Sequence, residues 1–234
     1  MKKTPNLPRQ LLICALIGIL AVVLTIVSDL IMLGKPTTAY SYIKLSTETM
    51  VNIPQWRVTY GTFLGVIMLP FQLLGLIPIY YGLKPAGKVK SILMILPAFY
   101  AAIIAVGFHI SYAFMASGWK LAYKLEAGNL MVKDMLSTFN LYWTITLVIM
   151  AIAVTFSSIL YVELLRTKKT LFPNWMVFFN PFSIIFCVFL IIVLIPAPVG
   201  GFIAPTFLNL STLIFFTTSL FSRKEAQLGE HSIV

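Results

Sequence analysis

The sequence predicts an all-α fold: a polytopic membrane bundle of six transmembrane helices in one domain, residues 1–234. Three observations predict it, namely the composition, the length of the apolar runs and the placement of the basic residues. Hydrophobic residues make up 59% of the 234 and charged residues 10%, and the mean hydropathy is +0.95. Soluble chains carry about 25% charged residues. Since so few charges cannot cover a protein in water, we expect lipid around the middle of each helix.

Six apolar runs are long enough to cross a bilayer. A hydrocarbon core about 30 Å thick needs roughly 20 helical residues. The runs are residues 11–33, 59–82, 91–117, 137–164, 174–195 and 202–222. No further segment is apolar enough to supply a seventh span.

The first three runs each carry a distinctive feature. Run 11–33 is too long for the apolar part of a signal peptide and no small-residue cleavage site follows it, so we expect it to remain as a helix. Run 59–82 places Gly61 and Gly65 at a GxxxG spacing, which lets helices approach closely. Run 91–117 contains AVGFHISYAF, in which His109 interrupts an apolar stretch.

The remaining runs and the loops complete the expected topology. Run 137–164 begins STFNLYW, and run 174–195 contains Asn180-Pro181, which we interpret as a kink. The segment 118–136 has mixed charge and predicts an amphipathic surface helix. The short connection PAPVGG predicts that the last two helices form a tight pair.

The basic residues predict the orientation. With the N-terminus in the cytoplasm, eleven of the 17 lysines and arginines lie on the inside and six on the outside. Basic residues collect in cytoplasmic loops of membrane proteins. Both termini are therefore expected in the cytoplasm, and a bacterial cytoplasmic membrane is the expected location. Because the basic residues flank apolar runs, they do not indicate nucleic acid as a partner.

Several kinds of active centre are excluded by the residues present. The chain has only two histidines, two isolated cysteines, and no HExxH, GxSxG or P-loop motif. No metal or cofactor is expected, and no catalytic residue is assigned. Ser28, Asp29 and His109 have the residue types of a serine triad, but adjacent helical residues point about 100° apart, which is poor geometry for one.

Polar residues at a shared depth predict a site instead. Ionisable side chains inside a bilayer usually face protein or water. In the expected topology several polar side chains fall in the outer half of the bundle, with Gln72 nearer the middle and Arg57 at the mouth. The predicted ligand-binding residues are Asp29, His109, Tyr112, Asn140, Asn209, Gln72 and Arg57.

Structural interpretations of the same residues stay open. Asp29 is near enough to the outer end of its helix to reach water by snorkelling. His109 and the two asparagines can serve as hydrogen-bonded contacts between helices.

Short motifs throughout the chain resemble a family of small bacterial six-span membrane proteins without an established activity. The motifs are SDLIML (28–33), PQWR (54–57), GLKPAGK (82–88), GFHISYA (107–113), FNP (179–181) and PAPVGGFIAPTFLNLS (196–211). The resemblance implies a multi-span inner-membrane protein and brings no substrate or catalytic residue with it.

Three functions remain open. The first is binding of a small or amphipathic molecule in an outward-facing polar pocket, by a sensor, carrier or protective factor. The second is an enzyme that uses Asp29 and His109 as an acid–base pair on a lipid-soluble substrate. The third is a proton-coupled transporter, which the absence of an internal repeat disfavours. The expected partners are membrane lipid, the unidentified ligand and, as an open alternative, a second copy of the chain.

Overall fold

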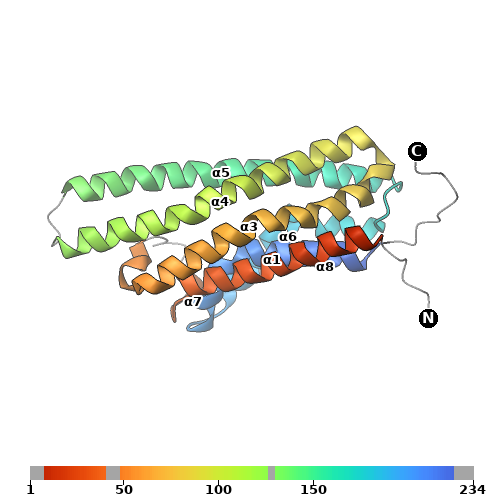
Figure 1. Cartoon of the computed structure of the whole chain (residues 1–234). Coiled ribbons are helices and arrows are strands. Elements are labelled where there is room, and N and C mark those ends of the chain that lie inside the picture. Colours follow the sequence, from red (N-terminus) through yellow and green to blue (C-terminus); the bar gives the residue numbers. More distant parts are fainter. Residues whose placement is uncertain (1–7, 41–47, 126–129, 224–234) are drawn as a thin grey trace.

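The computed structural model describes residues 8–40, 48–125 and 130–223, which form only helices and their connections (Figure 1). Among these residues, five helices are long and apolar enough to cross a membrane, so the coarse prediction of an all-helical membrane protein agrees with the structure. The elements are α1 (Arg9–Leu33), η1 (Glu48–Asn52), α3 (Gln55–Leu83), η2 (Lys84–Ala86), α4 (Lys88–Lys124), α5 (Leu130–Arg166), η3 (Asn174–Phe179), α6 (Pro181–Leu194), α7 (Val199–Ile203), η4 (Ala204–Thr206) and α8 (Phe207–Phe221).

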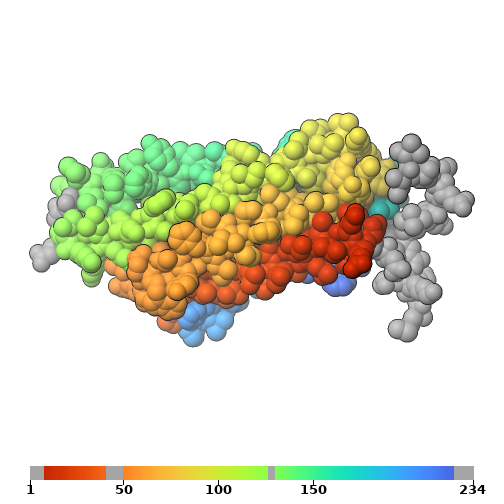
Figure 2. Space-filling view, viewed as in Figure 1, coloured from red at the N-terminus to blue at the C-terminus, as the bar shows by residue number. Residues whose placement is uncertain are grey.

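The long helices pack in a fixed order. α1 lies along α3, α3 along α4, and α4 along α5, while α8 packs against α1 and α6 (Figure 1). α1, α3 and α4 together cover one face of the molecule (Figure 2). α8 ends at the end of the bundle where α1 begins (Figure 1).

Glycines bring α1 and α3 into close contact. A Cβ added to Gly18 would lie 2.6 Å from the backbone of Gly75, and one added to Gly61 would lie 2.5 Å from the Met32 side chain. Gly61, Gly65, Gln72 and Gly75 are all buried on one face of α3. The GxxxG prediction of a close helix contact is therefore confirmed.

The predicted span 174–195 is wrong as one continuous helix. It is divided into η3 and the 14-residue α6, which is about 21 Å long, shorter than a bilayer core of about 30 Å. Asn180 is the N-cap of α6, because its Oδ1 accepts a hydrogen bond from the backbone N–H of Ser183 at 3.0 Å. Pro181 occupies the first helical position, where its missing N–H costs nothing. Asn180-Pro181 is thus a helix start and not a kink.

The predicted surface helix 118–136 is also wrong within the described residues. α4 continues to Lys124 and α5 already begins at Leu130, so the two long helices extend as an antiparallel hairpin. Residues 126–129 lie outside the described ranges. The hairpin has its own small core, because Met115, Ala122 and Leu136 bury their side chains against one another.

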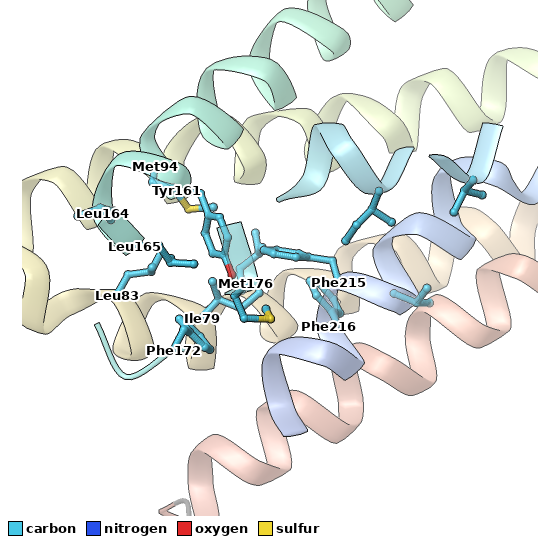
Figure 3. Close-up of a cluster of buried hydrophobic side chains, with 14 of the residues drawn as sticks. Ile79, Leu83, Met94, Tyr161, Leu164, Leu165, Phe172, Met176, Phe215 and Phe216 are labelled. Atoms are coloured by element: carbon cyan, nitrogen blue, oxygen red, sulfur yellow. The ribbon is translucent and has the colours of Figure 1, made fainter. Parts of the chain in front are cut away.

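Two larger apolar cores hold the bundle together. One runs along it, from Tyr161, whose ring extends toward Met176 and Phe215 (Figure 3), to Ala39 and Ala204. The other surrounds Met32 and Tyr112 on the side where α1 ends and α3 begins. The connection 196–201 docks on this side, since Gly201 donates to the Thr37 carbonyl at 2.8 Å. α6 and α8 pack together as the short connection predicts.

Candidate functional site

Three helices that are distant in sequence bring an aspartate, a histidine and an asparagine together. Asp29 on α1 and His109 on α4 are buried, with 4% and 5% of their surfaces exposed. Asn209 on α8 donates from Nδ2 to Asp29 Oδ2 at 2.7 Å. His109 Nδ1 lies 3.8 Å from Asp29 Oδ1. The distance is that of an ion pair and is too long for a direct hydrogen bond.

Gln72 extends the cluster to α3. Its Nε2 donates to Asn209 Oδ1 at 3.2 Å and to Thr25 Oγ1 at 2.9 Å. Thr25 in turn donates to the backbone carbonyl of Ala21 at 2.8 Å. Each polar group therefore has a partner on another helix, as a buried polar network requires to be stable. We call Thr25, Ser28, Asp29, Gln72, His109 and Asn209 the polar cluster.

The hydrogen bonds assign the proton on one nitrogen of His109. Ser28 Oγ donates to the Gly61 carbonyl, so its only proton is used there. His109 Nε2 lies 3.0 Å from that Oγ and 3.3 Å from the Gly61 carbonyl oxygen. Both are acceptors toward the ring, so Nε2 carries a proton and donates it. Nδ1, the nitrogen that faces Asp29, is left to bind or release a second proton.

Gly65 makes room for the imidazole. A Cβ at this position would lie 2.0 Å from His109 Nε2, far inside a normal contact distance. The close approach of α3 to α4 at a glycine therefore places the ring between Ser28 and Asp29.

One imidazole contacts both Ser28 and Asp29, which the sequence argument about their 100° separation did not anticipate. Ser28 nevertheless lacks the properties of a nucleophile. Its side chain is completely buried, and its hydroxyl donates to a backbone carbonyl. Ser28 also does not line the cavity described next, so a substrate in that cavity does not reach it.

The polar cluster lies at one end of a cavity of about 510 Å³. Its walls come from α1, α3, α4, α5, α6 and α8, and most of the lining is apolar. The polar lining residues are Asp29, Gln72, His109, Tyr112, Asn140, Thr144, Asn209 and Thr212. The apolar part includes Met94, Ala98, Leu147, Val154, Ile185 and Phe215.

An aromatic wall borders the polar end. The rings of Phe108 and Trp143 are stacked with centroids 4.7 Å apart, and Tyr112 meets the Trp143 ring edge-on at 5.7 Å. All three line the cavity. The Trp143 Nε1–H is buried, and no partner for it is found in the described part of the chain. Buried indole N–H groups normally have a partner.

Six of the seven predicted ligand-binding residues line this cavity, namely Asp29, His109, Tyr112, Asn140, Asn209 and Gln72. Asn140 is exposed on α5. Arg57 does not line the cavity. Its guanidinium donates to the carbonyls of Ile31 at 2.7 Å and Gly34 at 2.6 Å, where α1 ends. A cation at a helix C-terminus stabilises the unpaired carbonyls there.

Sequence reasoning named Tyr112 but missed Phe108 and Trp143 of the aromatic wall, and it missed the part that Ser28 plays in holding His109. Phe108 precedes His109, and Trp143 is one turn after Asn140, so their positions beside predicted site residues were the available signal. Within residues 8–40, 48–125 and 130–223, no three His, Cys, Asp or Glu side chains lie close enough together to hold a metal ion.

The comparisons identify a family. The model of a family of unknown function (DUF6796) matches residues 1–226. Because this match covers nearly the whole chain, the chain belongs to this family, whose description assigns no activity. No curated protein and no solved structure matches the chain.

Proposed function

We propose that this family member binds an amphipathic molecule in the cavity between its helices, as a carrier, a sensor or a protective factor. The observation that carries the proposal is the division of the cavity into a polar end at Asp29, His109 and Asn209 and an apolar remainder. Ligand pockets are mostly apolar, measure about 300–1,000 Å³ and contain a few convergent polar groups. The volume of about 510 Å³ lies in this range.

The exposure of α5 supports access of a ligand to the cavity from the side of the bundle. Between Leu136 and Ser157 this helix has no buried residue, although Asn140, Leu147 and Val154 line the cavity. The middle of α5 is thus a single wall between the cavity and the surface. A molecule that dissolves in lipid can reach such a cavity without crossing water.

We infer in addition that α6 completes a sixth span together with η3, and that both termini face the cytoplasm of a bacterial cell. The described chain begins and ends at the same end of the bundle, as an even number of crossings requires (Figure 1). Basic residues of the segments 84–90 and 166–169 lie where α3 and α5 end. This placement agrees with the rule for cytoplasmic loops.

The proposal is tested by filling the cavity. Leu147 lines it, whereas the next residue, Val148, is exposed and does not. We expect the protein purified in a mild detergent to retain an amphiphile, detectable by native mass spectrometry and by extraction. Leu147→Trp should lose this molecule, and the matched control Val148→Trp should retain it. Equal retention by the two variants would refute binding in the cavity.

A further inference from the structure

The charges that line the cavity restrict the head group of its ligand. Among the described residues that line the cavity, Asp29 is the carboxylate and His109 is the one nitrogen base, and lysine and arginine do not occur. An anionic head group would meet a carboxylate without a fixed cation to balance it. Charges with the same sign repel strongly where water is scarce.

The Asp29–His109 pair needs a proton when no cation is present. His109 Nε2 keeps its proton because it donates toward Ser28. The other ring nitrogen, Nδ1, lies 3.8 Å from Asp29 Oδ1 and carries either a lone pair or a proton. Asp29 Oδ2 accepts from Asn209. A buried carboxylate without a counter-charge is costly. One proton on Oδ1 or on Nδ1 makes the pair neutral overall. In the part of the chain that the structure describes, the only other ionisable group that lines the cavity is Tyr112.

From this geometry we infer that the ligand carries a cationic ammonium head, which replaces the shared proton at Asp29. When the head group binds, the pair loses one H⁺ to water, and the carboxylate and the ammonium balance each other's charge. The aromatic wall of Phe108, Tyr112 and Trp143 adds cation–π attraction, the interaction by which proteins recognise quaternary ammonium groups. This inference rests on the proposed function.

The length of the cavity fits an alkyl chain behind this head group. Its lining residues on α4 extend from Met94 to Tyr112, which is about 27 Å of helix. The lining beyond the polar end, which includes Met94, Ala98 and Val154, is apolar and suits such a chain.

The test uses dodecyltrimethylammonium, whose charge is permanent and which has no proton to release. Its binding to the protein in phosphatidylcholine nanodiscs is measured by calorimetry at pH 7 in two buffers with different ionisation enthalpies. Empty nanodiscs supply the reference, and dodecanoate is the anionic comparison. We expect release of close to one proton per bound cation, and dodecanoate binding at least tenfold weaker.

Two substitutions test whether Asp29 binds the cation and releases the proton. Asp29→Asn should weaken binding of the cation at least tenfold and abolish proton release. Asp134→Asn, a carboxylate-to-amide change on α5 away from the cavity lining, should change neither. If Asp29→Asn does not fold, as judged by gel filtration and circular dichroism, Leu147→Trp replaces it. This variant should lose the cation while leaving the polar cluster intact.

The outcomes separate the two proposals. Cation binding without proton release, or equally tight dodecanoate binding, would overturn the ammonium inference while leaving amphiphile binding in place. Binding of either amphiphile that Leu147→Trp does not weaken, or no binding of either, would overturn the proposed function as well.

Discussion

Replacing Gly65 with alanine should expel His109 from its position. The added Cβ would lie 2.0 Å from His109 Nε2 and 2.4 Å from Cδ2. Carbon atoms in contact need about 3.5–4.0 Å, so the ring has to move by about 1.5 Å or more. This movement breaks the 3.0 Å contact with Ser28 and changes the distance to Asp29.

The cost follows from overpacking of a filled interior, which is typically about 1–3 kcal/mol. For a chain of 150–250 residues, each kcal/mol lowers Tm by about 2–4 °C. We therefore expect Gly65→Ala to lower Tm by about 2–12 °C. Binding of dodecyltrimethylammonium should weaken at least tenfold, because the imidazole no longer faces Asp29.

Gly107→Ala is the matched control. It makes the same change one turn or less from His109 on α4, where an added Cβ meets no atom within 4 Å. Alanine is favoured over glycine in a helix by about 0.5–1 kcal/mol, so Tm should stay the same or rise. Both quantities are measured on purified protein, Tm from tryptophan fluorescence on heating. Identical Tm and affinity for the two variants would refute the packing of His109 against Gly65.

Three further substitutions test the supports of the fold. Arg57→Ala removes charged hydrogen bonds to the end of α1, each worth about 1.5–3 kcal/mol and not additive. It should lower Tm by at least about 4 °C without weakening cation binding. A loss of cation affinity with an unchanged Tm would show instead that Arg57 is part of the binding site. Asn180→Ala removes the N-cap of α6, worth about 0.5–2 kcal/mol, so circular dichroism on heating should show a lower Tm that Asn180→Asp largely recovers; an unchanged Tm contradicts the cap. Lys90→Gln breaks an exposed ion pair with Glu163, worth about 0–1 kcal/mol, and a fall in Tm above about 4 °C would contradict this value.

The sequence was sufficient for the long helices and for most of the polar lining of the cavity because both depend on simple rules. Long apolar runs have few alternatives to helix in lipid, and ionisable residues inside such runs face inward. This reasoning brought Asp29, His109 and Asn209 together before their helices could be placed.

The sequence predictions were wrong where a local hydrogen bond or a tertiary contact determines the position of a side chain. Asn180 begins a helix because its side chain accepts from Ser183, a bond that a hydropathy count does not contain. Arg57 turns to the carbonyls of α1 because that helix ends beside it. The contact of His109 with both Ser28 and Asp29 depends on how closely α3 and α4 approach at Gly65, which spacing along the chain does not give.

The length of α4 fixes how deep the cavity lies in a bilayer. The helix has 37 residues, about 55 Å, so it exceeds a hydrocarbon core of about 30 Å even when tilted by about 40°. If the basic end at Lys88 marks one interface, His109 lies 21 residues, about 32 Å, along the axis from it. The polar end of the cavity is then level with the head groups of the opposite leaflet, and the apolar lining continues past the bilayer midplane to Met94, about 9 Å from Lys88 along the axis. A bound amphiphile would stand parallel to the lipids of that leaflet and exchange with them sideways, without turning over.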